Sequence, residues 1–451
     1  MAEHEYKAVV NPCKLCMPLG AVLALKGVEA TVILLHGSQG CATYMRRFLG
    51  GHFNEPVDIA STALTEKDAI YGGGSNLERA FANILRQYQS VQMIGIPTTC
   101  LAETIGDDVE LMVEKLKKEG KTASVEVVPV STPSYAGTHL EGYYTAIYQI
   151  AKHLVKPPQQ KNCYDLNLIP GIISPADIRY LKRLLATIEV EAVFFPDYSE
   201  TLDGGATISY PLIPEGGTPL TQIRRLAQAR YTMQMGLSSS KLETVGDYLL
   251  KEFAVPLERI PLPVGLKGTD RLVGQLLRLK GLQSLPAEIE KERNRLLDAM
   301  VDAHKVLFGK RPAIYGDADL VEALTGFALE LGMQPAVLSI GGDNPETVQR
   351  LEQLTRNLTR RPVILNRADF TEIRQAVRQS KADLLIGGSD GEYIERTEGI
   401  PLVRTGFPVD DRFGSQRQLI VGYEGAMRLL DLWANAYLEL EQKKLRRETK
   451  C

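Results

Sequence analysis

Short apolar runs that alternate with amphipathic stretches limit the fold of this sequence more than any other feature. Runs rich in Val, Ile and Leu recur from the first third of the chain to the last, and stretches with apolar residues at helical spacing separate them. Strands that alternate with helices form parallel sheets covered by helices on both faces. We therefore predict an α/β protein with mostly parallel sheets in αβα layers.

The predicted strands fall into three groups along the chain. They span 30–35, 92–97 and 125–130, then 166–169, 191–195 and 259–264, and finally 312–315, 336–340, 362–365, 384–387 and 402–406. Helices are predicted between them, for example over 76–88, 107–118, 142–154 and 270–279. Ser174, with Pro175 after it, indicates another helix start.

Two polar segments indicate where one domain ends and the next begins. The stretch 156–161 is polar, and 288–305 has the pattern of a charged helix. A chain of 451 residues allows about three domains at roughly 150 residues each. We expect domains at 1–158, 159–300 and 301–451, the last of which ends in a helix.

The charge and hydropathy of the chain exclude several classes of partner. A net charge of −3 leaves no basic surface for a nucleic-acid backbone. Every apolar run is far shorter than the roughly 20 residues that cross a membrane, and the first residues lack the pattern of a secretory signal. We therefore expect a cytoplasmic protein whose six cysteines are thiols or metal ligands rather than disulfides.

Three of the cysteines lie in loops of the kind that bind ligands. Cys41 follows the strand 30–35 in HGSQGC, Cys100 follows the strand 92–97 in TTCLAE, and Cys16 precedes a predicted helix in PCKLCMPLG. Ligands of doubly wound sheets bind at the carboxyl ends of the strands. A helix N-terminus stabilises a thiolate through its dipole and its free N–H groups. Three thiolates that converge on one rim are suited to a soft iron–sulfur centre.

The positions of these cysteines leave two other interpretations open. Free cysteines are often small buried core residues, and the convergence of distant loops is not visible in one sequence. Cys13 and Cys16 also form a CxxC pair, which is the spacing of redox and zinc sites, although no second CxxC follows.

The motifs around the cysteines resemble those of a known family. The chain is similar to the β-type subunits of the nitrogenase component 1 superfamily. The matching segments extend from near the start of the chain to Ala426 and are VNPCKLCMPLGA, HGSQGC, HFNEP, IYGGGSN, TTCLAETIGDD, TPSYAGTH, KRPAIYGDADL, PLVRTGFPVDDR and VGYEGA. Three spaced cysteine motifs together with HGSQGC form a specific signature.

The resemblance implies a fold, a partner and a cofactor. The fold would be three Rossmann-like αβα domains, and an α-type subunit would complete an α2β2 heterotetramer. Cys16, Cys41 and Cys100 would ligate an [8Fe-7S] P-cluster shared with the α-type subunit, with a [4Fe-4S] cluster as the alternative. Ser134 matches a serine that ligates the oxidised cluster, although a turn serine explains it equally well. The active-site metal cofactor would belong to the partner.

The resemblance also implies a docking residue and a mechanism. Tyr71, in IYGGGSN, matches an aromatic residue where this family docks an ATP-dependent iron-protein reductase, which is a homodimer. An exposed aromatic residue beside glycines suits an interface anchor, whereas a half-buried loop tyrosine is the plain alternative. Electrons would pass from the reductase through the P-cluster to the cofactor of the partner. The chain would be an oxidoreductase subunit without a catalytic residue of its own.

Two kinds of family member compete for this chain. All three cysteine positions are filled, and a larger cluster needs more protein ligands, which favours an electron-relaying subunit. Its substrate would be dinitrogen or, as in methylthio-alkane reductase, a methylthio-alkane whose C–S bond is reduced. The segments 196–204 and 414–417 instead resemble scaffold subunits, on which the nitrogenase cofactor matures beside a smaller cluster.

Other polar residues near these motifs are interpreted as structural. His36, His52 and His139 have the character of hydrogen-bonded core residues, although His36 could also reach a cluster sulfur. Asp107 and Asp108 are expected to begin a helix, where carboxylates complement the dipole.

The remaining candidates are expected to be outside the site. Cys13 is expected to be a buried thiol, and Cys163 and Cys451 are expected not to be ligands. Asp410 and Asp411, together with the adjacent arginine at 412, are expected to form a structural or subunit-contact network.

Overall fold

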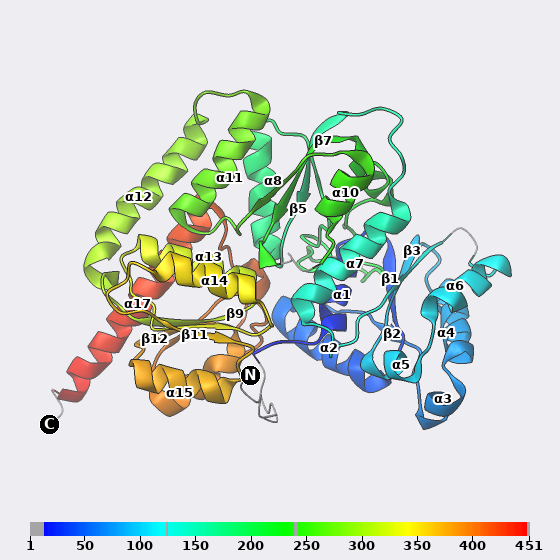
Figure 1. The fold of residues 1–451 in the computed structure, drawn as a ribbon, viewed down its shortest axis with the longest axis horizontal. Helices are drawn as coiled ribbons and strands as arrows, with labels where there is room; N and C mark the ends of the chain where they lie inside the picture. The colour runs from blue at the N-terminus through cyan, green and yellow to red at the C-terminus, as the bar shows by residue number, and fades with distance from the viewer. Residues whose placement is uncertain (1–12, 123–124, 239–241, 449–451) are drawn as a thin grey trace.

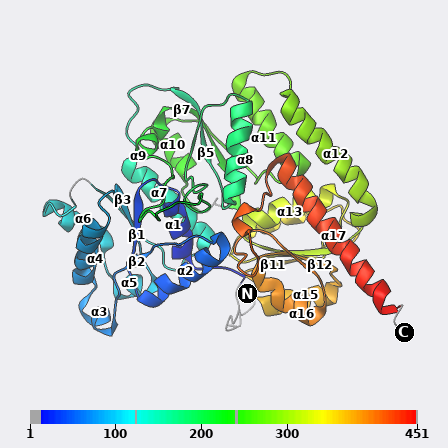
Figure 2. The same ribbon diagram turned by 180° about the vertical axis from the view of Figure 1, so that it is seen from behind.

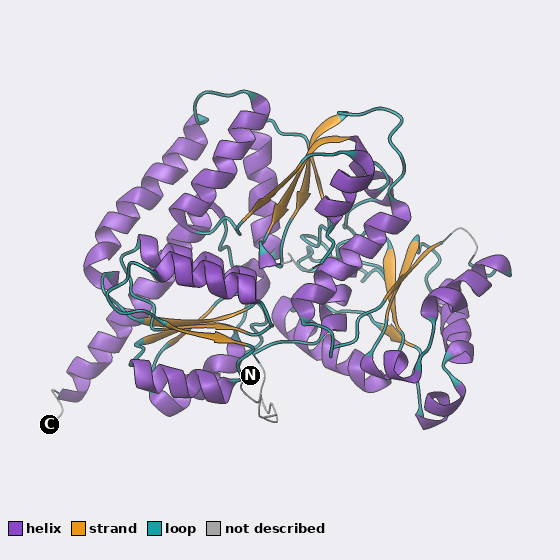
Figure 3. Cartoon of the chain, in the orientation of Figure 1, coloured by secondary structure: helices purple, strands orange, loops and turns teal. Residues whose placement is uncertain are grey.

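The computed structural model describes residues 13–122, 125–238 and 242–448, which form three lobes (Figure 1). One sheet lies in each lobe, and helices cover both faces of each sheet (Figure 3). Every strand pair within the described residues is parallel. The prediction of an α/β protein with three parallel-sheet αβα units is confirmed.

The first sheet has the strand order β2-β1-β3-β4. Its strands are β1 (Thr31–Leu35), β2 (Ala60–Ser61), β3 (Met93–Pro97) and β4 (Glu126–Val130). Strands β1 and β3 lie side by side, with Thr31 opposite Met93 and Ile33 opposite Gly95, and both are buried along their whole length. The order of the chain reverses between them, which makes their carboxyl ends the expected place for a ligand.

The second sheet contains a central strand that its sequence conceals. The order is β6-β5-β7-β8, with β5 (Tyr164–Ile169), β6 (Ala192–Phe194), β7 (Ala229–Met235) and β8 (Leu257–Ile260). Polar residues interrupt β7, so its apolar pattern does not predict a strand. Thr232 of β7 is nevertheless fully buried, and its hydroxyl accepts a hydrogen bond from Asn167 Nδ2 at 3.1 Å. A buried polar contact thus joins the two central strands.

The third sheet has the order β11-β10-β9-β12-β13. Its strands are β9 (Pro312–Gly316), β10 (Val337–Ile340), β11 (Val363–Asn366), β12 (Leu384–Gly387) and β13 (Leu402–Arg404). Their bounds differ little from the predicted ranges, because the central strands β10 and β12 are short, mostly apolar runs that are buried throughout.

The helices connect and cover these sheets. Those of the first lobe are α1 (Met17–Lys26), α2 (Gln39–Phe53), α3 (Glu66–Tyr71), α4 (Gly74–Gln87), α5 (Cys100–Ile105), α6 (Val109–Lys118) and α7 (His139–Leu154). Those of the second are α8 (Pro175–Thr187), α9 (Leu220–Ile223), α10 (Val245–Phe253), α11 (Gly265–Lys280) and α12 (Ala287–Leu307). The third has α13 (Ala318–Glu330), α14 (Pro345–Thr355), α15 (Phe370–Ser380), α16 (Glu392–Glu398) and α17 (Gly422–Glu448). Within the described ranges, no helix combines the length and the apolar character needed to cross a lipid bilayer.

The capping and packing of two helices bear on the predicted boundaries. Ser174 caps α8 as expected, and its hydroxyl accepts from Asp177 N at 3.0 Å. Helix α12 continues through the predicted boundary at residue 300, and α17 packs back against α11 and α12 (Figure 2). The domain limits themselves stay a prediction.

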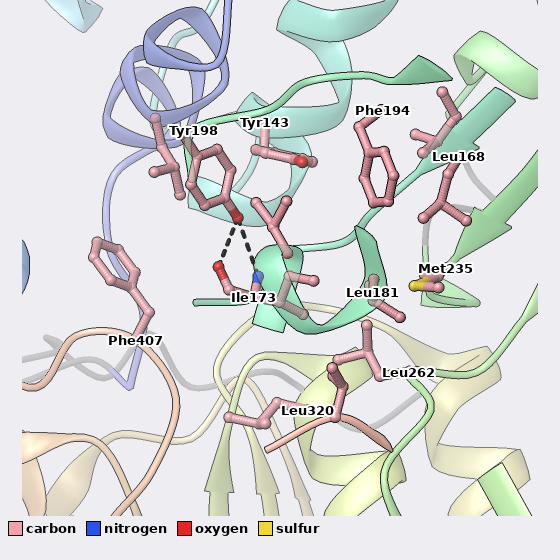
Figure 4. Packing of buried hydrophobic residues seen from close by; sticks show 14 of the residues in the cluster. Tyr143, Leu168, Ile173, Leu181, Phe194, Tyr198, Met235, Leu262, Leu320 and Phe407 are labelled. Carbon is pink, nitrogen blue, oxygen red and sulfur yellow. Dashed lines mark hydrogen bonds between the residues drawn. The ribbon is translucent and has the colours of Figure 1, made fainter. Parts of the chain in front are cut away.

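One buried apolar cluster joins all three lobes (Figure 4). It includes Tyr143 from the first lobe, Leu168 from the second and Leu320 from the third. Tyr198 crosses this cluster, and its hydroxyl donates to Ile173 O at 2.8 Å and accepts from Ile173 N at 3.1 Å. The polar end of a fully buried aromatic side chain is therefore satisfied within the core.

Helices α1 and α7 cross so closely that only glycine fits at the crossing. A Cβ atom on Gly20 would lie 1.7 Å from His139 O, and one on Gly142 would lie 1.8 Å from Met17 O. The obstruction is backbone, which cannot rotate away as a side chain can. The crossing holds the start of α1, where Cys16 lies, against the start of α7.

We expect the substitution Gly142→Ala to destabilise the protein by roughly 1–3 kcal/mol, because the added methyl group forces the two helices apart. The matched control is Gly274→Ala in α11, where a Cβ meets no atom within 4 Å. There alanine should be neutral or slightly stabilising. The thermal unfolding midpoints of the two variants measure the difference, and equal midpoints would contradict the close crossing.

Two histidines are buried as neutral side chains, as expected for core residues. Burial lowers the pKa of His52 to about 3 and the pKa of His139 to about 4. His52 Nδ1 accepts from Val409 N at 2.9 Å, and His139 Nδ1 accepts from Leu15 N at 3.4 Å. Both nitrogens accept hydrogen bonds, which requires that they carry no proton.

Acid should therefore destabilise the protein through His52. The unfolded histidine takes up a proton below its ordinary pKa of about 6.5, whereas the folded one does so only near 3. Stability from this residue is complete above pH 6.5 and is lost as the pH falls, by about 1.4 kcal/mol per pH unit. Unfolding midpoints of wild type and His52→Gln between pH 7.5 and 5 test this. The variant should lose stability less steeply, and parallel profiles would show that His52 does not contribute.

Candidate functional site

The two cysteine loops of the first lobe meet at the carboxyl ends of β1 and β3. Helix α2 begins after β1 with Cys41 in its first turn, and α5 begins after β3 with Cys100 as its first residue. His36, just after β1, forms a parallel bridge with Thr98, and its carbonyl accepts from Thr99 N at 3.1 Å. The strand pairing of the sheet therefore continues into both loops.

The third cysteine reaches the same rim from a different element. Cys16 is the N-cap of α1, and its backbone forms an antiparallel bridge with Thr138 at the start of α7. Leu15 O also accepts a hydrogen bond from His139 N at 3.1 Å. The position of Cys16 thus depends on the α1–α7 crossing and not on the sheet.

The three sulfur atoms lie close enough for their charges to interact. The pKa of the Cys16 thiol is raised to about 11, chiefly by burial and further by negative charge on Cys41 and Cys100. All three side chains are partly exposed and form no disulfide. The structure therefore brings the predicted trio together at one open rim, where a bound cation would relieve the repulsion between thiolates.

Two of the sulfurs accept hydrogen bonds from neighbouring residues. Ser134 N donates to Cys100 Sγ at 3.2 Å, and Ser38 Oγ donates to Cys41 Sγ at 3.5 Å. The predicted site residue Ser134 is therefore placed beside Cys100. Ser38 did not stand out in the sequence, although its place three residues before Cys41 in HGSQGC was a signal for it.

The donor set fits an iron–sulfur group better than a single ion. Among the residues that the structure describes, no three His, Cys, Asp or Glu side chains close around one metal ion. A zinc site needs its ligands within about 2.3 Å of one ion, whereas a cluster spans wider gaps with its own inorganic atoms. Sulfur ligands that receive hydrogen bonds are typical of such clusters.

Cys13 is a buried thiol, as expected, and not a member of the trio. It packs against Ala313 and Tyr315 in the core of the third lobe, and its backbone N donates to Ala368 O at 3.3 Å. Burial raises the pKa of the Cys13 thiol well above its ordinary range, with a further contribution from Asp390. The CxxC spacing thus separates two thiols into different environments.

Cys163 has a hydrogen-bond partner outside the cysteine rim. Cys163 is partly exposed, and its thiol donates to Gln160 O at 3.5 Å. Cys451 lies outside the described residues.

Tyr71, at the end of α3, is largely exposed to solvent. Its side chain is 80% exposed, and that of Ile70 beside it is 77% exposed. The alternative of a half-buried loop tyrosine is wrong. A pair of adjacent exposed apolar side chains at a helix end is typical of a contact surface.

A buried contact that the sequence did not predict links this helix end to the cysteine loops. Asp107 Oδ2 lies 2.9 Å from His36 Nε2, and both carboxylate oxygens of Asp107 accept from Gly73 N, at 3.1 and 3.0 Å. Asp108 begins α6 as expected and accepts from Leu111 N at 2.9 Å. The expectation that Asp107 also begins this helix is wrong, because its side chain turns inward to His36.

The acidic and basic residues near the end of the third lobe form a network within the chain. Asp411 Oδ2 lies 2.6 Å from an Arg404 nitrogen and 3.0 Å from an Arg412 nitrogen. Asp410 N donates to Ser389 Oγ at 2.9 Å. The expectation of a structural network is confirmed for Asp411 and for the arginine at 412, whereas Asp410 takes part through its backbone N.

The two segments that resemble scaffold subunits also meet. Arg417 lies 3.5 Å from Asp203 in an ion pair. This contact joins the second and third lobes and contains no candidate ligand.

The whole chain is similar to β chains of nitrogenases. It is 35% identical to the nitrogenase molybdenum-iron protein beta chain of Clostridium pasteurianum, over 96% of this chain and 94% of that one. It is also 35% identical to the nitrogenase vanadium-iron protein beta chain of Trichormus variabilis, over 98% and 96% of the two chains. A chain in the structure titled "Nitrogenase Cp1 at pH 6.5" superposes with a TM-score of 0.93 at 34% identity, over 98% of this chain and 96% of that chain.

The family model described as nitrogenase component 1 type oxidoreductase matches residues 16–438. That range begins at Cys16 and contains Cys41, Cys100 and all three sheets. The similarity therefore covers the fold and the cysteine rim together. The chain belongs to the nitrogenase component 1 family, as a β-type member.

Proposed function

We propose that this chain relays electrons as the β-type subunit of a nitrogenase-like component 1. It holds half of an [8Fe-7S] P-cluster at its junction with an α-type partner. An ATP-dependent iron-protein reductase supplies the electrons, and a metal cofactor in the partner receives them. The observation that carries the proposal is the meeting of Cys16, Cys41 and Cys100, from three separate segments, at one open rim.

The residues at the rim have defined tasks in this function. A cluster bound by these residues would supply one-electron redox chemistry. Cys16, Cys41 and Cys100 hold it on the ends of three helices, which limits how far its position changes between redox states. Ser134 N and Ser38 Oγ donate to ligand sulfurs and so stabilise their negative charge, which raises the reduction potential of the site.

The openness of the rim supports a shared site. Three protein thiols are too few to cover an eight-iron cluster, and the cysteine side chains remain partly exposed in this chain alone. An α-type subunit that brings its own thiolates would close the site and exclude water. This supports an α2β2 assembly, while the cytoplasmic location stays a prediction.

The partner decides the substrate in this proposal. The relatives at 35% identity are named as chains of molybdenum-iron and vanadium-iron nitrogenases, which favours dinitrogen over a methylthio-alkane. The filled cysteine positions favour the electron relay over a cofactor scaffold. Parallel assays of the purified complex with dinitrogen and with dimethyl sulfide test the substrate, and conversion of the sulfide alone would reverse this choice.

Replacement of Cys100 by alanine should remove the cluster and leave the fold. Cys100 is partly exposed and contributes little packing, so its replacement should lower the metal content and not the stability of the fold. We expect Cys100→Ala to lose most of the junction iron and nearly all reductase-dependent turnover. Iron counting and EPR on the anaerobically purified complex measure this. The control Cys163→Ala, a thiol bonded to a loop carbonyl, should keep both.

The iron content of the wild-type complex separates the proposed functions. Eight irons at each αβ junction support the P-cluster, and four support the scaffold alternative. Full iron content in Cys100→Ala would contradict the ligand assignment.

Removal of the exposed aromatic side chain at the end of α3 should weaken docking of the reductase. A central aromatic anchor at an interface is worth about 2 kcal/mol, so Tyr71→Ala should raise the reductase concentration for half-maximal turnover by roughly 30-fold. Maximal turnover at saturating reductase should change much less. The control is Val301→Ala on α12, which is 75% exposed in another lobe (Figure 1). An unchanged reductase titration for Tyr71→Ala would place the docking surface elsewhere.

A further inference from the structure

The carboxylate of Asp107 connects three segments that the sequence keeps apart. It lies between α5 and α6, its side chain is 5% exposed, and it contacts the fully buried ring of His36. Its two oxygens also accept from Gly73 N, two residues after the end of α3, where Ile70 and Tyr71 are exposed. One buried group therefore contacts the loop after β1 and the loop after α3.

The space around this contact leaves little freedom for movement. A Cβ on Gly73 would lie 2.6 Å from Asp107 Oδ2, 2.6 Å from Leu64 Cδ2 and 2.9 Å from His36 Cε1. The backbone at Gly73 is thus packed directly on the pair of side chains. A shift of the α3 end must move Asp107 or break its hydrogen bonds.

His36 carries the connection on to the cysteine loops. Its own N donates to Pro97 O at 2.9 Å, and its carbonyl accepts from Thr99 N at 3.1 Å, one residue before Cys100. Along the chain it opens the segment that leads through Ser38 to Cys41. Burial lowers the pKa of His36, which favours its uncharged form. Because a carboxylate can only accept, Nε2 of His36 is the donor in the contact with Asp107.

We propose that Asp107 is a positioning residue that transmits reductase docking at Ile70 and Tyr71 to the cluster cysteines Cys41 and Cys100. This inference rests on the proposed function and deepens it. A charge-assisted hydrogen bond in a buried site is strong and directional, so the two loops move with the α3 end instead of independently. Docking of the reductase thereby changes the geometry of the loops that carry Cys41 and Cys100.

The position of Asp107 gives the test a matched pair of variants. Asp107→Ala removes the contacts to His36 and Gly73. Asp108→Ala removes the adjacent carboxylate, whose contact is the cap of α6. Both variants lose a hydrogen-bonded carboxylate within the two residues that precede α6, but only the first loses the contacts to His36 and Gly73. Asp107→Asn keeps an acceptor for Gly73 N and should fall between wild type and Asp107→Ala.

The experiment compares these variants in the complete αβ complex with its reductase. We expect Asp107→Ala to keep the wild-type iron content and cluster midpoint potential in a dye-mediated redox titration. Reductase-driven electron flow should fall about tenfold, as expected for a lost charge-assisted hydrogen bond. More ATP should be hydrolysed for each electron transferred. In a Tyr71→Ala background, Asp107→Ala should add much less than it does alone, because both act through one docking step.

Three results would overturn the inference. Wild-type ATP use per electron in Asp107→Ala would show that docking is transmitted elsewhere. A loss of iron in proportion to activity would make Asp107 a support of the cluster alone. An equal defect in Asp108→Ala would assign the effect to the helix start. Absence of iron from the wild-type junction would instead overturn the proposed function itself, and is recognised before any variant is made.

Discussion

The parallel pairing of β1 with β3 is the contact on which the candidate site depends. It brings the loop that leads to Cys41 beside the loop that leads to Cys100, and the bridge between His36 and Thr98 extends the pairing beyond the strands. The strand order β2-β1-β3-β4 makes this meeting possible. The connections from β1 and β3 lead to opposite sides of the sheet, which leaves space for a ligand between the two loops. The strand pairing places both loops side by side and requires no direct contact between Cys41 and Cys100.

The third ligand of the proposed cluster depends on a different constraint. Cys16 reaches the rim because α1 and α7 cross at Gly20 and Gly142, where any larger residue would meet backbone atoms. The site therefore combines a sheet edge with a helix crossing, and damage to either would displace one ligand from the others. These two constraints together explain how Cys16 and Cys100, more than eighty positions apart in the chain, reach the same rim.

Electrostatics determines what such a rim can hold. Three thiolates close together repel one another, and burial makes the charged form of Cys16 more costly still. A polynuclear iron centre reverses this balance, because its positive metal ions stabilise deprotonated thiols. The hydrogen bonds from Ser38 and Ser134 add to that stabilisation of the thiolate charge.

The sequence by itself determined the fold class and most strands, because short apolar runs flanked by amphipathic helices have few other ways to bury their faces. It also located the three cysteine loops, since Cys41 and Cys100 follow predicted strands and Cys16 precedes a predicted helix. It did not reveal β7, whose polar residues are satisfied by a neighbouring strand. Burial of that kind depends on partners distant in the chain.

Only the tertiary structure decided which residues share an environment. It separated Cys13 from Cys16, although two residues lie between them, and it turned Asp107 inward to His36 while Asp108 capped the next helix. Side chains of adjacent residues point in different directions when the backbone bends, and the local sequence pattern does not show which partner each side chain contacts. The physical reason is that hydrogen bonds and burial are satisfied across the fold, between segments whose distance in sequence carries no information about their distance in space.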